Sequence, residues 1–319
     1  TIVFNAIRLD PRERYPSVEA LSTDIRRYLS GAPPQSASQA ALARQEHSAT
    51  VSIAILPFRV LGDQSNSHGF LASGVTDALI TRLSRLERLS IPPPSAVLKY
   101  SNGIEAVRAA KDLRVQYVLE GSIHTAGEYV RASVQLVFAE AGIAVWAAQF
   151  DEQAKDLLKF EDSIAEQVAN ALIPHLTGEE RAQLTRSGTA SSRAHECYLR
   201  GRWHWSRSAS NQEELAKALV CFMEAIADDP KYARAHAGVA DYYLRLGLWG
   251  GLPPAESCAA ALQSAETAVQ LDPTLGEAHA SLAFALWAYR GDYSAAEQHF
   301  NLAIIRNPDY ASAHHWFGL

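Results

Sequence analysis

Residues 232–243 read YARAHAGVADYY, residues 276–287 read GEAHASLAFALW, and residues 311–319 read ASAHHWFGL. The Ala-His pairs of these segments lie 43 and then 35 residues apart. The prolines that precede them repeat the same two intervals: Pro230, Pro273 and Pro308. Two markers that shift together indicate an internal repeat with a period near 34 residues.

A stripe of small and aromatic residues recurs between the quoted segments. Its steps of four and then three residues keep the side chains on one face of a helix. The members are Ala218, Phe222 and Ala225; Ala261, Ala265 and Ala268; and Ala296, Phe300 and Ala303. The prolines cannot continue a helix and so end it. Residues 194–319 are therefore predicted to form an α-solenoid of three helix pairs and the start of a fourth, with a generic helical bundle as the alternative.

These spacings resemble the tetratricopeptide repeat. One departure is the stretch GLWGGLPPAES at residues 247–257, which adds about ten residues between the helices of the second unit. The resemblance implies that the first helix of each pair lines a groove that receives a partner protein or peptide. We expect six side chains to line it: Arg234, Asp241, Leu244, Glu277, Phe284 and Trp287. The alternative is that they face solvent or a further repeat.

Composition excludes several classes of protein. The net charge of −6 argues against a nucleic-acid-binding surface. Cys197, Cys221 and Cys258 form no C-x-x-C pair, which indicates a reducing compartment, and we expect a cytoplasmic location. No apolar run reaches 18 residues, so the sequence predicts no membrane segment.

The first residues carry a second resemblance. A helical stripe in residues 1–34 includes Val18, Leu21 and Ile25. The run AIRLDPRERYPSVEALSTDIRRYL resembles the end of the C-terminal lobe of bacterial serine/threonine protein kinases. That resemblance implies that Arg14 would pair with a glutamate of an activation segment, which this sequence lacks. It also implies that ATP and magnesium belong to a kinase domain outside this chain, and that the chain itself is a non-catalytic fragment without a cofactor. Residues 35–50 are polar and small, as in a linker.

Residues 51–178 are predicted to form a small α+β domain with a mixed sheet. Strands are expected over 51–61, in LSIPPPSAV at 89–97, in a hairpin that turns at Gly127, and in IAVWAAQFDE at 143–152. Helices are expected over 75–89, 103–113 and 154–176, from apolar residues at helical spacing. The three prolines at 92–94 confine the second strand to a sheet edge or lie at a strand end. Residues 179–193 would connect this domain to the repeats, and we expect Trp203 and Trp205 to pack the two together.

Five separated segments of this domain resemble, in order, the TolB-like N-terminal domain: SIAILPF, GVTDALITRLSRL, YVLEGSI, VRASVQLV and VWAAQFD. The resemblance implies a sensing or protein-binding role, because such domains precede tetratricopeptide repeats in bacterial kinases, cyclases and transcription regulators. It brings no catalytic residues.

Motifs for chemistry are missing from the sequence. It contains no G-x-x-x-x-G-K-[ST], G-x-S-x-G, H-E-x-x-H or G-x-G-x-x-G. A metal site at His314 and His315 with His236 and His279 is an alternative, but three of these residues share one repeat position, which favours helix packing. We therefore expect a non-catalytic interaction region of a bacterial serine/threonine kinase. The alternatives are the same module in a winged-helix regulator or adenylate cyclase, and a hydrolase.

Overall fold

The computed structural model describes Ser22, Thr23, Ile25 and Arg26, and then residues 50–61, 69–100, 106–126, 129–153, 156–173, 175–185, 187–248, 251, 253–307 and 310–318. The chain divides into two compact units, Thr1–Val51 and Ser52–Leu319. In the first unit the residues described from 22 to 26 are helical, where the sequence predicts a helix, and Ile25 is 41% exposed. Arg14 and the other residues of the kinase-like segment lie outside the described residues.

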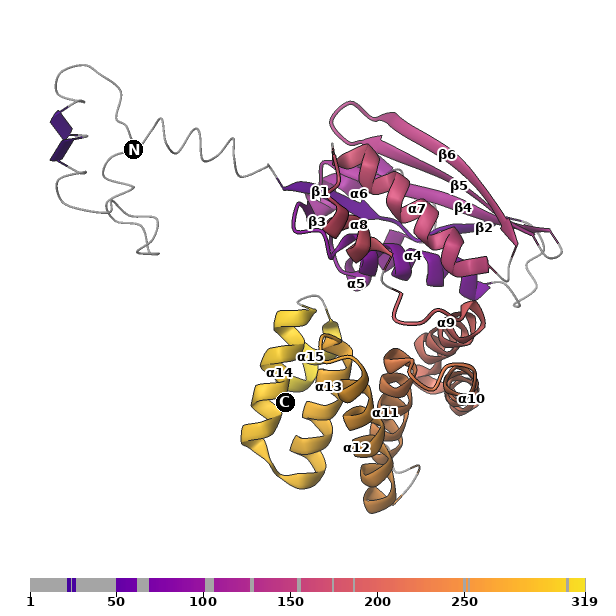
Figure 1. Cartoon of the computed structure of the whole chain (residues 1–319), viewed down its shortest axis with the longest axis vertical. Helices are drawn as coiled ribbons and strands as arrows, with labels where there is room; N and C mark the ends of the chain where they lie inside the picture. Colours follow the sequence, from indigo (N-terminus) through magenta and orange to yellow (C-terminus); the bar gives the residue numbers. More distant parts are fainter. Residues whose placement is uncertain are drawn as a thin grey trace. The chain divides into compact units, whose positions relative to one another are not determined.

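A mixed sheet forms the core of the α/β domain, as predicted (Figure 1). The strands are β1 (Val51–Ile55), β2 (Arg59–Leu61), β3 (Leu89–Ser90), β4 (Tyr117–Ala126), β5 (Tyr129–Phe138) and β6 (Ile143–Gln153). Their order is β3-β1-β4-β5-β6, and β2 also pairs with β4. Strands β1 and β2 run parallel to β4, whereas β4, β5 and β6 are antiparallel. The short β3 lies at the edge, as its neighbouring prolines require.

Pro57 divides the first predicted strand in two. Both halves pair with β4, Ile53–Ile55 opposite Tyr117–Leu119 and Arg59–Leu61 opposite Ser122–His124. Proline has no amide hydrogen to give to the ladder, so pairing stops around it. The next amide, that of Phe58, donates to the Oγ1 of Thr76 at 3.1 Å instead.

Helices α4 (Gly69–Leu83) and α7 (Leu157–Leu172) pack against each other and the sheet. The domain also contains α5 (Pro94–Val97), α6 (Ala106–Leu113) and α8 (Gly178–Leu184). Helix α4 starts earlier than the predicted 75–89. Fully buried side chains join the helices to the strands, among them Ile53, Leu79, Leu119, Phe160 and Ile164. Residues at every second position of β5 are buried, which confirms the predicted alternation up to a register shift at Leu136/Val137.

The repeats form a stack of antiparallel helices (Figure 1). They are α9 (Ser192–Arg207), α10 (Gln212–Asp228), α11 (Ala233–Leu248), α12 (Pro254–Leu271), α13 (Gly276–Ala285), α14 (Tyr293–Arg306) and α15 (Ala311–Phe317). A π-helical turn, Leu286–Arg290, extends α13. Each helix contacts the next, and each first helix of a pair also contacts the following first helix. This is the predicted solenoid arrangement.

Phe222 shows why small residues recur. Its ring is fully buried between α9, α10 and α11. A Cβ atom added to Gly201 or Gly238 would lie only 2.5 or 2.9 Å from this ring. The two glycines therefore make room for one aromatic ring at a three-helix contact. The predicted stripes are also confirmed, since all nine of their residues are at most 3% exposed.

The repeated histidines have a structural role. The Nε2 of His236 hydrogen-bonds the carbonyl of Pro230 at 3.0 Å, and the Nε2 of His279 hydrogen-bonds that of Pro273 at 3.0 Å. In both cases the histidine satisfies a carbonyl six residues earlier, in the turn that precedes its helix. The shared repeat position thus reflects the packing of each first helix onto the turn before it, which agrees with the helix-packing interpretation that the sequence favours over metal binding.

Candidate functional site

Asp241 of α11 lies at the centre of a polar cluster on the first helices. Its carboxylate accepts a hydrogen bond of 2.5 Å from the Ser281 hydroxyl of α13 and one of 3.4 Å from the Tyr310 hydroxyl, which precedes α15. A guanidinium nitrogen of Arg202 in α9 lies 3.8 Å from the same carboxylate. Side chains of four successive repeat units therefore meet at one carboxylate, which is 4% exposed.

The electrostatics of this cluster involve the α/β domain as well. Burial raises the pKa of Asp241 to about 6, although the Ser281 hydroxyl and Arg202 favour the ionised form. The protein atoms around Asp77 on α4 likewise raise the pKa of that carboxyl group to about 6 by desolvation, against the attraction of Arg202, although Asp77 itself is exposed to solvent. Arg202 thus interacts electrostatically with one acid from each domain, Asp77 and Asp241.

These raised pKa values predict a pH dependence of stability. Between about pH 4 and 6 the folded chain binds more protons than the unfolded chain, so its free energy of unfolding falls as pH rises through this window. Asp241→Asn removes one of the two carboxyl groups with a raised pKa. The decrease in the free energy of unfolding with rising pH should therefore be smaller in the variant, by on the order of 2 kcal/mol. Urea unfolding at several pH values from 4.5 to about 7 checks the expectation. If the free energy of unfolding depended on pH equally in the variant and the parent chain, the prediction would be contradicted.

A second polar cluster joins the next first helices. The Nδ2 of Asn307 donates to the Glu277 carboxylate at 3.0 Å, and Arg234 is attracted to the same carboxylate. Arg234 and Glu277 occupy equivalent repeat positions and are both half-buried. They retain exposed surface with which to contact another molecule.

The six predicted groove residues have three different surroundings. Arg234, Glu277 and Trp287 are half-buried, and Asp241 is buried within the polar cluster. Leu244 and Phe284 are 1% and 0% exposed and belong to the core between helices. The expectation that Asp241, Leu244 and Phe284 are accessible is wrong. Leu244 follows the buried Ala240 by one helical turn and so shares its packing face, and Phe284 is covered by Trp287 and Trp316 at ring separations of 5.4 and 4.9 Å.

A buried polar chain connects the α/β domain to the repeats. Arg82 of α4 donates to the Glu161 carboxylate of α7 at 2.9 Å and also pairs with Asp162. The same Glu161 accepts from the Nε2 of His195 in α9 at 2.9 Å, and the Nδ1 of His195 lies 3.1 Å from the Tyr232 hydroxyl. Arg82, Glu161, His195 and Tyr232 are each at most 4% exposed.

The direction of these hydrogen bonds follows from their chemistry. An ionised carboxylate only accepts, so the Nε2 of His195 carries a proton. In the tautomer with the proton on Nε2, the Nδ1 atom accepts from the Tyr232 hydroxyl. Burial raises the pKa of Tyr232 well above its usual value, which keeps that hydroxyl protonated. The chain therefore runs without interruption from α4 through α7 and α9 to the start of α11.

Sequence reasoning missed this chain, although one signal for it exists. Ala194-His195 is a fourth copy of the repeated Ala-His pair. The residue six positions before His195 is Thr189 rather than proline, and its hydroxyl donates to Asp229. His195 instead bonds Glu161 across the junction. Trp203 lies against Gly69 of the α/β domain, as predicted, whereas Trp205 packs inside the repeats beside Phe222 and the guanidinium of Arg245.

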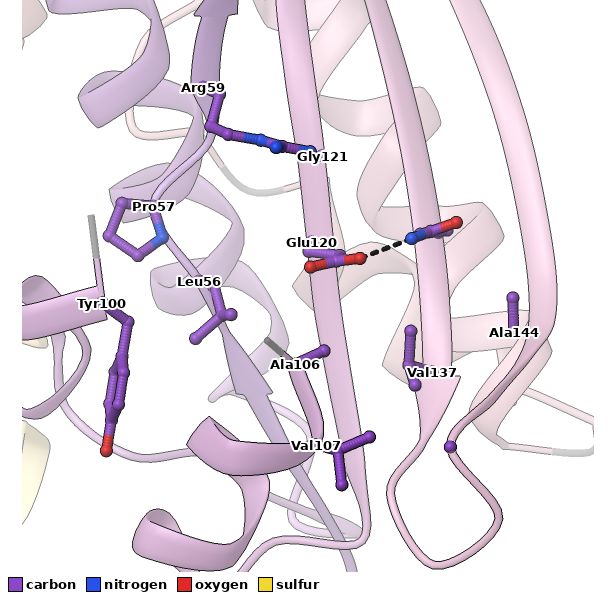
Figure 2. Close-up of a pocket in the computed structure, with 12 residues that line it drawn as sticks. Leu56, Pro57, Arg59, Tyr100, Ala106, Val107, Glu120, Gly121, Val137 and Ala144 are labelled. Carbon is purple, nitrogen blue, oxygen red and sulfur yellow. Dashed lines mark hydrogen bonds between the residues drawn. The ribbon is translucent and has the colours of Figure 1, made fainter. Parts of the chain in front are cut away.

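The sheet of the α/β domain carries a hollow (Figure 2). Its volume is about 380 Å³, and it adjoins a second hollow of about 570 Å³ that shares Arg59, Glu120, Gly121 and Gln135. The Gln135 amide donates a hydrogen bond to the Glu120 carboxylate across β4 and β5. The wall of the first hollow also includes Leu56, Tyr100 and Val107. Polar and apolar groups therefore meet in one recess.

Among the described residues, no group of three or more histidine, cysteine, aspartate or glutamate side chains is placed to hold a metal ion. Among the same residues, no helix is both long and apolar enough to cross a membrane.

Comparisons with solved structures return proteins similar to each domain. The first tetratricopeptide repeat domain of Spaghetti (RPAP3), bound to an HSP90 peptide, is 18% identical and covers 40% of this chain and 91% of its own, with a TM-score of 0.32. TolB from Acinetobacter baumannii is 15% identical and covers 39% of this chain and 28% of its own, with a TM-score of 0.28.

Comparisons of sequence reach further along the chain. A family model described as the second domain of HilA/YgeH-like transcriptional regulators matches residues 48–167. A protein of Rhizobium meliloti (strain 1021) named putative adenylate cyclase 3 is 30% identical over 247 residues, which is 76% of this chain. The chain spans 41% of that relative's length.

Proposed function

We propose that this chain is a non-catalytic regulatory region of a larger bacterial signalling protein and that it binds a partner protein or peptide through the first helices of its repeats. The observation that carries the proposal is the row of polar and aromatic side chains along these helices. Arg234, Glu277 and Trp287 keep exposed surface there, beside the buried cluster around Asp241. Mixed charge next to an aromatic ring suits an extended peptide or a partner helix.

The junction supports a regulatory role in the same proposal. A partner that contacts Arg234 or Glu277 would lie near Tyr232, the last member of the buried chain that reaches Glu161 in the α/β domain. Arg202 is coupled electrostatically to acids of both domains. Binding at the repeats would therefore be sensed in the α/β domain through rigid, hydrogen-bonded contacts.

For the output of the whole protein, we propose nucleotide cyclisation. This rests on the similarity of three quarters of the chain to a protein named putative adenylate cyclase 3. A transcription regulator is the second candidate, because the family model that matches residues 48–167 is named for such regulators. The serine/threonine kinase interpretation rests on residues 1–34 alone, and no comparison adds to it. Reading the neighbouring codons for cyclase, winged-helix or HRD and DFG motifs distinguishes the three.

A binding experiment tests the groove. The partner proteins captured by the parent chain are compared with those captured by the Trp287→Ala, Arg234→Glu double variant. We expect partners to be lost from the variant, with at least tenfold weaker binding, since it removes an aromatic contact and reverses a charge. Val220→Ala, at an exposed position of α10, is the matched control and should keep them. An unchanged set of partners would remove the groove from the proposal.

A further inference from the structure

The hollow on the sheet of the α/β domain contains two opposite charges that do not neutralise each other. Arg59 lies on β2 and Glu120 on β4, and both line the two adjoining recesses. Neither forms an ion pair with any residue of the described part of the chain. Glu120 is half-buried, and its hydrogen-bond partner is the uncharged amide of Gln135. The charge of the Glu120 carboxylate is therefore not balanced by a cation among the described residues, which leaves it available to a cationic group of a ligand.

Charged and apolar groups lie in different parts of the recess. Figure 2 shows Arg59 reaching over the sheet toward Gly121 at one end, with Glu120 in the middle. The apolar side chains of Leu56, Ala106 and Val107 lie toward the other end. A guanidinium is a fork-shaped donor that matches a carboxylate, whereas a carboxylate accepts from an ammonium group. The recess thus offers complementary partners for a zwitterion and an apolar surface beside them.

The recess lies beside the turn between β5 and β6. Gly142 in this turn has a φ of 66°, a conformation that glycine adopts without strain, and it lies close to Val107 of α6. Tyr100 is held in the wall by its hydroxyl, which donates to Asp112 at 3.3 Å. The volume of about 380 Å³ lies within the range of small-molecule sites.

We propose that this hollow binds a free α-amino acid with an apolar side chain. Its carboxylate would pair with Arg59, its ammonium group with Glu120, and its side chain would lie against Val107 and Leu56. The inference goes beyond the proposed function, because it concerns the sheet and not the repeats. It gives the α/β domain a chemical signal of its own.

The test is a calorimetric or NMR titration with three probes: L-leucine, N-acetyl-L-leucine and L-leucinamide. The second probe lacks the ammonium group and the third lacks the carboxylate. We expect saturable binding of L-leucine and at least tenfold weaker binding of the two analogues, because each loses one charged contact. No saturation by L-leucine at about 10 mM would overturn the proposal.

Three variants locate the binding. Arg59→Gln and Glu120→Gln should each weaken L-leucine binding at least tenfold. The latter change keeps an acceptor for Gln135, so the sheet is expected to fold normally. Arg131→Gln is the control, since Arg131 lies on β5 outside the hollow and pairs with Asp151 at 2.5 Å. Equal binding by all four proteins would place leucine elsewhere and overturn the proposal. Partner capture by the repeats, measured separately, does not depend on this result.

Discussion

Phe222→Ala is expected to lower the free energy of unfolding by about 3–5 kcal/mol, the usual cost of removing a fully buried aromatic ring. Phe222 of α10 is 0% exposed, and its ring packs closely against Gly201 of α9 and Gly238 of α11. The ring of Tyr198 lies 6.0 Å away. Because both glycines lack side chains, neighbouring residues cannot move in to fill the cavity. Urea unfolding followed by helical circular dichroism measures the loss.

The adjacent residue provides a matched control. Met223 lies on the same helix and is 53% exposed. Met223→Ala is expected to change stability by less than about 0.5 kcal/mol. A small effect at Phe222, comparable with that at Met223, would mean that α10 does not pack as described. Repeats unfold partly as local units and circular dichroism sums over all helices, so amide hydrogen exchange of residues 192–318 is the measurement that assigns the loss to the repeats.

Glu161→Ala is expected to cost about 3 kcal/mol and to loosen the junction of the two domains. The substitution leaves the buried guanidinium of Arg82 and the buried ring of His195 without their shared acceptor. Asp162 and the Leu184 carbonyl still contact Arg82, which places the effect at the lower end of the range for broken buried pairs. Amide hydrogen exchange should become faster in both α7 and α9, because the contact between them is lost.

Glu166→Gln is the control for this prediction. Glu166 lies on the same helix and pairs with Arg181 at 3.1 Å, but both side chains are more than 40% exposed. Exposed pairs contribute about 0–1 kcal/mol, so hydrogen exchange in α9 should not change. If Glu161→Ala leaves α9 as protected as the parent chain, the buried chain does not hold the domains together. The regulatory part of the proposed function would then lose its physical basis.

Local patterns predicted much of the fold. The 4-then-3 spacing of Ala218, Phe222 and Ala225 places them on one helix face, and all three are buried. The alternation along β5 places Val130 and Ala132 in the core, and Pro57 interrupts pairing in the first strand. These features depend on residues two to four positions apart, whose relation the backbone geometry fixes.

The candidate site was predicted less well. Counting from the small-residue position gave Leu244 an accessible place, but the same helical turn that buries Ala240 buries Leu244. Arg202 carries no motif, and its importance follows from its 3.8 Å approach to Asp241 and its electrostatic attraction to Asp77. These two acids lie 39 and 125 residues away from Arg202 in the sequence. No local pattern reports such pairs.

Residue spacing along the chain is enough to establish helices that repeat with small residues and prolines in register, and an α/β domain before them. The role of each repeated residue depends on its tertiary contacts. His236 and His279 bond the proline carbonyl before their own helices, whereas His195, at the same repeat position, bonds Glu161 of another domain. The reason is physical: a repeat fixes where a side chain points, but its partner is whatever group the packing of distant segments brings within hydrogen-bonding distance.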